Sequence, residues 1–188
     1  MTKNNLVGQL LVANPLNPKD GLDHSVILVL SHNSTTSLGL RLNCPAKSLQ
    51  LKTVFDQLGL YYQDNDPVYH SGNLITDKIH MVHSLDWRGL TTIELTPEIG
   101  VTNDISVLAA ICKGEGPEYY RACAGVLTWA DSSLVRQLDP KTDTKFKWEL
   151  APADLVTVFQ TDELEQWHKC IEASAKNQVN KWFNLFQG

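Results

Sequence analysis

The segment VYHSGNLITDKIHMVHS, residues 68–84, brings together three histidines, two serines and an aspartate within seventeen positions. Hydroxyl, imidazole and carboxylate groups are the parts of a nucleophilic triad, and imidazole nitrogens are common zinc ligands. A serine hydrolase would use Ser71 or Ser31 as the nucleophile, a nearby histidine such as His70 or His83 as the base, and Asp77 or Asp86 to orient the base. A metal-dependent enzyme would instead use the histidines together with Asp77.

The spacing of the histidines bears on both enzyme hypotheses. The segment is predicted to form two antiparallel strands, near 67–71 and 79–84, around a seven-residue connection. His80 and His83 are three residues apart, and this offset places side chains on opposite faces of a strand. His70 would lie on the other strand of the pair, within reach of either. Two zinc ligands from one strand would need a bulge, so we favour a structural role for these histidines.

A second polar cluster lies at His32 and Asn33, between two strands predicted over 25–31 and 38–43. We expect a β-hairpin with these two residues at its tip, facing Asn43 across the pair. As structural residues, both asparagines are typical of turns. As functional residues, a His–Asn–Asn edge at the mouth of a hairpin would offer donors and acceptors to a polar ligand. Both interpretations stay open at this point.

The elements that must position these residues follow from hydrophobic periodicity and from helix-ending residues. Leu51, Val54, Phe55 and Leu58 are spaced as one face of a helix that Gly59 ends. The rest of the first half is typical of strands joined by turns. This combination predicts a mixed α and β domain.

The second half is predicted to change from strand to helix. A helix is expected over 102–114 and a buried strand over 119–129. From Pro152 the chain is expected to be helical to about residue 186. The first helix would end at Phe159, and one long amphipathic helix, or two with a break near Asn177, would follow. The apolar stripe of this last segment, either core or a surface for a partner, comprises Leu164, Trp167, Ile171, Ala175, Val179, Trp182 and Phe186.

Length and composition are typical of one globular domain. The chain has 188 residues, of which 43% are hydrophobic and 20% are charged, near the averages for folded domains. Its net charge of −5 argues against direct nucleic-acid binding, which depends on clustered lysine and arginine. No apolar run reaches the length of a membrane span. We therefore expect a single domain over residues 1–188 and no membrane association.

The cysteines and the missing motifs narrow the functional classes. Cys44, Cys112, Cys123 and Cys170 show neither C-x-x-C nor metal-type spacing, which is typical of free thiols in a reducing compartment. The N-terminal residues lack an uninterrupted secretory core, so we expect a cytoplasmic protein. The two common glycine-rich phosphate loops and the G-x-S-x-G of α/β-hydrolases are absent. We predict no cofactor and no resident metal.

Four segments follow an ordered set of motifs. LLVANPLNPKDGLDHSVILVLSHNSTTSLGLRLNCP (10–45) runs from a strand through an H-N turn into L-G-L-x-x-N-x-P. PVYHSGNLITDKIHMVHS (67–84) follows P-V-x-x-G-G-P-x-x-x-D-x-x-x-x-L-H, and AGVLTWADSSLVRQL (124–138) and APADLVTVFQTDELEQW (151–167) come later. In this order and spacing the chain resembles the AlgH/YqgE family of small bacterial proteins. The main matching positions are His32, Asn33, Gly39, Leu40, Asn43, Pro45, Pro67, Gly72, Asp77 and His83.

The resemblance implies an α+β fold. A branched, mostly antiparallel sheet would curl into a pseudo-barrel with flanking helices and a helical C-terminus. The family implies no established enzymatic activity and no cofactor, and a transcription-regulator label accompanies it. The chain departs from the family at Ser71 and Asn73, where glycine and proline are usual, so a family site at this turn would be altered here.

Two functional hypotheses follow. The first is a non-catalytic binding or regulatory protein that acts through an unknown protein partner or small ligand. The second is the hydrolase or metal-dependent enzyme built from His70 or His83 with Ser71 or Asp77. Under the first hypothesis the binding residues fall at predicted strand ends and turns, where binding groups are often displayed. These expected ligand-binding residues are His32, Asn33, Gly39, Asn43, Gly72, Asp77 and His83.

Overall fold

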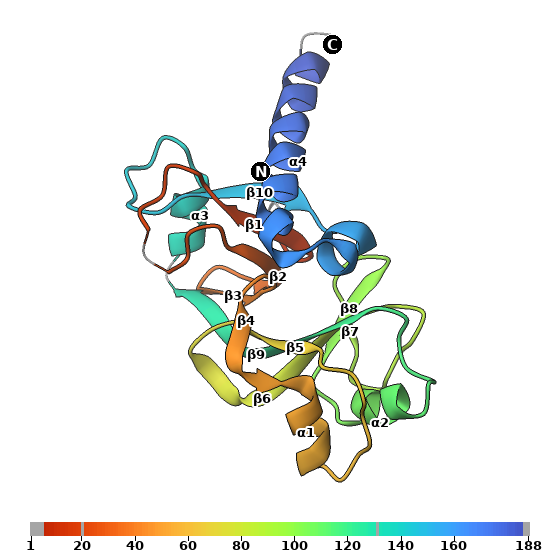
Figure 1. Ribbon diagram of the computed structural model, residues 1–188. Coiled ribbons are helices and arrows are strands. Elements are labelled where there is room, and N and C mark those ends of the chain that lie inside the picture. Colours follow the sequence, from red (N-terminus) through yellow and green to blue (C-terminus); the bar gives the residue numbers. More distant parts are fainter. Residues whose placement is uncertain (1–5, 20, 131, 186–188) are drawn as a thin grey trace.

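The computed structural model describes residues 6–19, 21–130 and 132–185, with side chains described up to residue 180. A curled sheet forms the centre, and helices lie on both of its sides (Figure 1). The strands are β1 (Gln9–Ala13), β2 (Val26–His32), β3 (Thr36–Arg41), β4 (Pro45–Gln50), β5 (Pro67–His70), β6 (Leu74–Ser84), β7 (Ile93–Glu94), β8 (Ile99–Thr102), β9 (Tyr120–Ala130) and β10 (Trp148–Pro152). The helices are α1 (Leu51–Gln57), α2 (Ser106–Cys112), α3 (Ser133–Leu138) and α4 (Glu163–Leu185), with a π-helical turn η1 at Val156–Gln160.

The sheet branches at β9. One edge of this strand pairs antiparallel with β6. The opposite edge is shared, because residues 122–124 pair in parallel with β5 and residues 127–130 pair antiparallel with β3. The main path runs β10-β1-β2-β3-β9-β6-β8-β7 with antiparallel neighbours. The expected branched, mostly antiparallel sheet is therefore confirmed.

Two glycines allow close approach of the chain at this branch. Gly125 lies between the two pairing regions with φ of 77°, a conformation that glycine adopts without strain. A Cβ added at Gly72 would lie within 3.0 Å of the main-chain O and C of Val126. The connection from β5 to β6 therefore lies directly against the main chain of β9.

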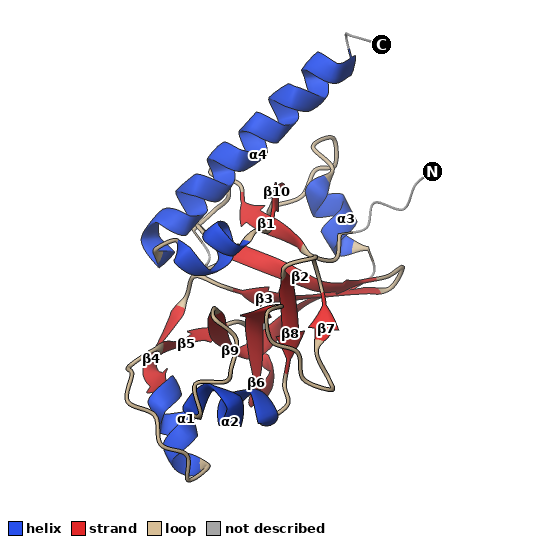
Figure 2. Ribbon diagram, turned by 90° about the vertical axis from the view of Figure 1, so that its right-hand side faces the viewer, coloured by secondary structure: helices blue, strands red, loops and turns tan. Residues whose placement is uncertain are grey.

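The sheet separates two hydrophobic cores. Figure 2 shows α4 with β1 and β10 on one side and α1 with α2 on the other. Successive residues of β6 and β9 point to opposite faces, so Met81 and Ala122 enter the smaller core, whereas Val82 and Cys123 enter the larger one. The smaller core comprises Leu51, Phe55, Tyr62, Val68, Met81, Val107, Leu108 and Ala122.

The short helices on the smaller core agree with the hydrophobic pattern. In α1, Leu51 and Phe55 are fully buried, which confirms the predicted helix, whereas Leu58 of the predicted apolar face is the C-cap and is 42% exposed. Helix α2 buries Val107 and Leu108 but is shorter than the predicted range of 102–114. The reason for the difference is that the chain up to Thr102 pairs with β6 as strand β8.

Two predicted arrangements are wrong. Strands β5 and β6 exist, but they are not paired with each other, because β9 lies between them and pairs with both. The predicted helix from Pro152 to Phe159 is replaced by the end of β10 and by η1. Pro152 pairs with Gln9 at the edge of the sheet, where a missing N–H is tolerated.

The C-terminal segment forms one helix, α4, without a break at Asn177. Its buried side comprises Gln166, Trp167, Cys170 and Ser174, and the side chains described after Ser174 are exposed. Of the predicted stripe, Trp167 is buried but Leu164 is 84% exposed. The helix then projects away from the body (Figures 1 and 2). The side chains of Trp182 and Phe186 lie outside the described residues.

In the described part of the chain, no helix combines the length and the apolar character needed to cross a bilayer.

Candidate functional site

At the tip of the β2–β3 hairpin, His32 and Asn33 stabilise the turn. His32 Nδ1 lies 2.8 Å from Oγ of Ser37, its partner across the hairpin. Asn33 Oδ1 accepts hydrogen bonds from the main-chain N–H of Thr35 at 2.9 Å and of Thr36 at 2.8 Å. Contacts of this kind hold turns in place. Both side chains are therefore engaged within the hairpin itself.

Asn43 lies at the opposite end of the same hairpin. Its Oδ1 accepts a hydrogen bond from the N–H of Val26 at 3.0 Å, and its Nδ2 donates to the carbonyl of His24 at 2.7 Å. The prediction that Asn43 faces His32 and Asn33 is wrong. The chain between them is occupied by the whole of β3, which carries Asn43 to the far end of β2.

Gly39, Gly72 and Ser71 have packing and hydrogen-bonding roles. A Cβ at Gly39 would lie 2.6 Å from Cγ2 of Ile27, and one at Gly72 would meet the main chain of β9. Ser71 is fully buried, and its hydroxyl donates to the carbonyl of Arg41 at 2.7 Å. A nucleophile needs a neighbouring base and access to substrate. Ser71 is buried away from any substrate, and its hydroxyl contacts a carbonyl oxygen in place of a base.

His83 is a neutral core residue. Its side chain is fully buried, and its ring packs edge-on against Trp87 with centroids 5.3 Å apart. Nδ1 lies 2.9 Å from the carbonyl of Ser84, which can only accept, so Nδ1 carries the proton. Nε2 then faces the hydroxyl of Thr92 at 3.4 Å as an acceptor. Burial lowers the pKa of His83, although the Ser84 carbonyl opposes this change.

The other two histidines do not join His83. His80 and His83 lie on one regular stretch of β6, which confirms that they face opposite sides of the strand. Nε2 of His80 is buried without a hydrogen-bond partner in the described structure, and burial, then the charge of Lys78, lower the pKa of this side chain. His70 lies on β5, beyond β9. Within the described ranges, no three His, Cys, Asp or Glu side chains are placed to hold a metal.

Asp77 differs from the other expected binding residues because it lines a surface hollow. This hollow, the Asp77 groove, has a volume of about 390 Å³ and lies between α1, α2 and β6. Its polar lining comprises Asp77, Lys78, Asn103 and Asp104. Its apolar lining comprises Val54, Leu58, Ile79, Met81, Ile105 and Leu108.

Local structure explains why apolar and charged groups meet in the Asp77 groove. Asp77 lies in a bulge, since residues 75–78 of β6 stand opposite residue 125 of β9. Asp104 Oδ1 accepts the main-chain N–H of Ser106, the first residue of α2, at 2.9 Å. Leu58 and Ile105 remain 42% and 54% exposed. The groove thus displays apolar surface beside two carboxylates.

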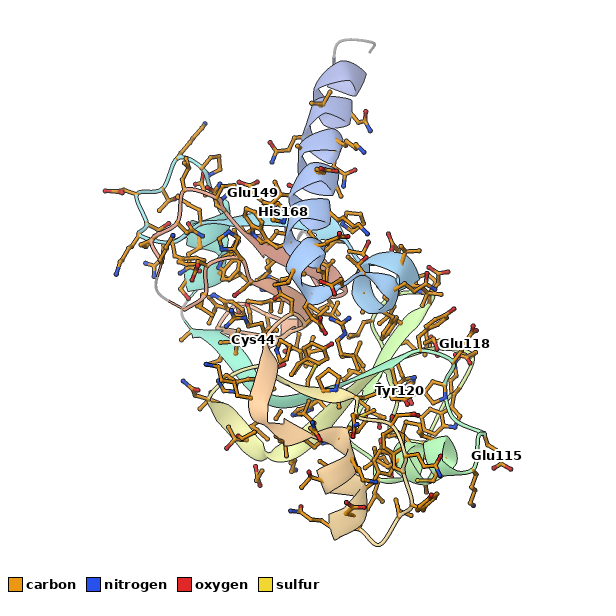
Figure 3. All side chains as sticks on the ribbon, viewed as in Figure 1. Cys44, Glu115, Glu118, Tyr120, Glu149 and His168 are labelled. Carbon is orange, nitrogen blue, oxygen red and sulfur yellow. The ribbon has the colours of Figure 1, made fainter. Side chains whose placement is uncertain are left out.

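A second hollow lies at the other end of α2 and was not predicted. This hollow, the Tyr120 pocket, has a volume of about 460 Å³ and is lined by Tyr61, Tyr62, Asp64, Cys112, Glu118 and Tyr120, among others. Figure 3 shows Glu118 and Tyr120 on the segment that enters β9 from α2. Of these lining residues, Tyr62 donates a hydrogen bond to Asp66, and its hydroxyl lies 2.7 Å from that of Tyr120. The clusters YYQDND (61–66) and PEYY (117–120) were the available sequence signals, but nothing local shows that they meet.

The fold defines a class: an α+β protein with a curled, branched and mostly antiparallel sheet, without a metal-holding cluster of His, Cys, Asp or Glu among its described residues. The AlgH-like family model matches residues 10–177, so the chain belongs to the AlgH-like family. A UPF0301 protein of Methylococcus capsulatus is 30% identical over 167 residues, covering 88% of this chain and 89% of that protein. A UPF0301 protein of Actinobacillus pleuropneumoniae is 30% identical over 169 residues, covering 87% and 88%.

Solved structures show the same fold. The solution structure of the AlgH protein from Pseudomonas aeruginosa matches with a TM-score of 0.72 at 24% identity, over 92% of this chain and 90% of that one. A crystal structure of a Corynebacterium diphtheriae protein matches with a TM-score of 0.65 at 20% identity, over 85% and 82%. At these identities the likeness establishes architecture, including the curled sheet and the helices around it. The activity has to be argued from the surface of this chain.

Proposed function

We propose that this protein is a non-catalytic binding protein that holds a segment of a protein partner in the Asp77 groove. The observation that carries this proposal is that two exposed apolar side chains, Leu58 and Ile105, line the groove together with two carboxylates. The partner segment would insert an apolar side chain between Leu58 and Ile105. A lysine or arginine next to that side chain would face Asp77 and Asp104.

The two parts of the groove contribute differently to binding. Burying one leucine-sized side chain stabilises a complex by about 1.5–3 kcal/mol. An exposed ion pair adds only about 0.2–1 kcal/mol, so the carboxylates select the charge of the partner more than they set the affinity. Neither Asp77 nor Asp104 is ion-paired with another described residue. Both are therefore available to a basic partner.

Any regulatory role of the protein would act through this partner. The net charge of −5 disfavours direct contact with DNA. A transcription-related role would therefore be exerted through contacts with another protein. A cytoplasmic location belongs to the same proposal. It is supported by the four cysteines, all of which are described and carry free thiols.

Peptide titration tests this proposal. Two acetylated hexapeptides would share a Leu-Leu centre, one flanked by arginines and the other by glutamates, and amide NMR shifts would locate their binding. We expect the arginine peptide to bind about fivefold tighter, with shifts confined to α1, α2 and the bulge of β6. Equal affinities, or shifts located elsewhere, would refute the assignment.

Matched variants separate the groove from the rest of the surface. Ile105→Ser should weaken both peptides, whereas Asp77→Asn should weaken only the arginine peptide. Leu164→Ser and Asp143→Asn alter an exposed leucine and an exposed aspartate elsewhere, so they should bind like the unaltered protein.

A further inference from the structure

The Tyr120 pocket combines aromatic rings and carboxylates without a cation. Its walls include three tyrosines, Asp64 and Glu118, and its described lining contains no lysine, arginine or histidine. Neither carboxylate is ion-paired with a described residue, and Glu118 has the hydroxyl of Tyr119 beside it. Tyr61 leaves 74% of its surface exposed at the mouth of the pocket. The lining therefore offers acceptors and aromatic faces to a positively charged group.

The hydrogen bonds behind the pocket fix the direction of its donors. Tyr62 and Tyr120 supply two hydroxyl protons, whereas three oxygen contacts link them with each other and with Asp66. In the longest of these contacts the Tyr120 hydroxyl donates to the Asp66 carboxylate at 3.2 Å. Tyr62 and Tyr120 thus both donate to the Asp66 carboxylate, and their hydroxyl oxygens lie 2.7 Å apart.

The hydrogen bond to Asp66 makes the oxygen of Tyr120 a better acceptor toward the pocket. A hydroxyl that donates to a carboxylate is polarised, and hydrogen bonds in one network strengthen one another. Burial is the largest cause of the raised pKa of both Tyr62 and Tyr120, so both phenols keep their protons at neutral pH. The Asp66 carboxylate thus polarises Tyr120, which lines the pocket.

We propose that the Tyr120 pocket binds a small organic cation with N–H donors, a primary amine or a guanidine on a short alkyl body. The charged head would donate to the Tyr120 oxygen and pair with Asp64 and Glu118, and Tyr61 would cover it. The alkyl body would lie against Ile111, which also lines the pocket. The volume of about 460 Å³ is within the range of small-molecule sites. This site lies at the opposite end of α2 from the Asp77 groove, so the two proposals stand or fall separately.

Cys112 provides a reporter inside the pocket. It lines the hollow and is partly exposed, whereas Cys123 and Cys170 are buried, so replacing Cys44 with serine leaves Cys112 as the accessible thiol. Burial raises the pKa of the Cys112 thiol, so alkylation by iodoacetamide would be followed in mildly alkaline buffer. Diaminobutane and butylguanidinium are the probes, with butanol as a neutral control of similar size.

The expected result is that both cations slow alkylation of Cys112 several-fold and that butanol does not. Combining Asp64→Asn with Glu118→Gln should raise the cation concentration needed to protect Cys112 by about fivefold or more. Both changes are at exposed positions, so folding should stay intact. Asp143→Asn is the matched control and should change nothing.

Three results would overturn the proposal. One is an equal effect of butanol, and another is protection that survives removal of both carboxylates. The third is protection by an acetylated Gly-Lys-Gly amide at the same or lower concentration, which would assign the pocket to a protein side chain in place of a free amine. Tyr120→Phe supplies an independent check, because it removes the polarised oxygen and should weaken the cations while thermal unfolding reports whether the fold persists.

Discussion

Replacement of Gly72 by alanine tests the tight contact on which the branched sheet depends. The new Cβ would lie within 3.0 Å of the main-chain O and C of Val126 and 2.7 Å from the N of Leu127. Main-chain atoms cannot move aside as a flexible side chain can. Overpacking costs about 1–3 kcal/mol when side chains yield, so we expect a loss of about 3 kcal/mol here. The free energy of unfolding of a typical domain is only about 5–15 kcal/mol.

Two other glycines serve as internal controls. Gly59 has φ of 69° and open space around its would-be Cβ, so Gly59→Ala should cost only the conformational strain, about 1 kcal/mol. Gly125 combines φ of 77° with a clash against Gly72 and should cost the most. The measurement is urea unfolding followed by circular dichroism. If Gly72→Ala loses no more than Gly59→Ala, the close approach to β9 is not the constraint that the structure implies.

Three further predictions concern buried polar side chains. Burial is the main cause of the lowered pKa of His80 and His83, so below about pH 6.5 the unfolded chain binds more protons than the folded one and the free energy of unfolding falls on acidification. In His83→Gln, urea unfolding at a series of pH values should show a shallower fall of this free energy with decreasing pH. An unchanged pH dependence would argue against this cause. Ser71→Ala leaves the carbonyl of Arg41 without its donor and should cost about 1–3 kcal/mol, and the unaltered protein should resist a fluorophosphonate probe; covalent labelling at Ser71 would reinstate the hydrolase. Trp167→Phe removes the indole donor to a main-chain oxygen of β1 and should cost about 1–3 kcal/mol in urea, with no loss expected if that 2.8 Å bond is unimportant.

Sequence reasoning succeeded where one element determines its own pattern. The spacing of Leu51 and Phe55 placed α1, because side chains four residues apart share a helical face. The odd offset between His80 and His83 placed them on opposite faces of β6. The composition of 119–129 predicted the strand that became β9. The branched sheet itself was expected from family resemblance and not from these local patterns.

The failures share a different physical cause. Strand β10 forms because Pro152 and its neighbours pair with β1, a partner at the other end of the chain. Tyr62 and Tyr120 meet across 58 positions, and only the paths of α1 and β9 bring them together. Asp77 lines a groove because of a bulge that the alternating pattern conceals. Long-range pairing and irregular backbone therefore form both hollows. Neither of these causes leaves a local pattern in the sequence.

Charge reversal at Asp77 tests the binding proposal most directly. Asp77 is exposed and makes no hydrogen bond or ion pair with the described residues, so Asp77→Lys should leave the fold intact. The proposal predicts that the variant loses its preference for the arginine-flanked peptide and binds the glutamate-flanked one tighter by about fivefold, while Asp143→Lys keeps the original preference. A variant that still prefers the arginine peptide to the same degree would contradict the assignment of the partner to the Asp77 groove.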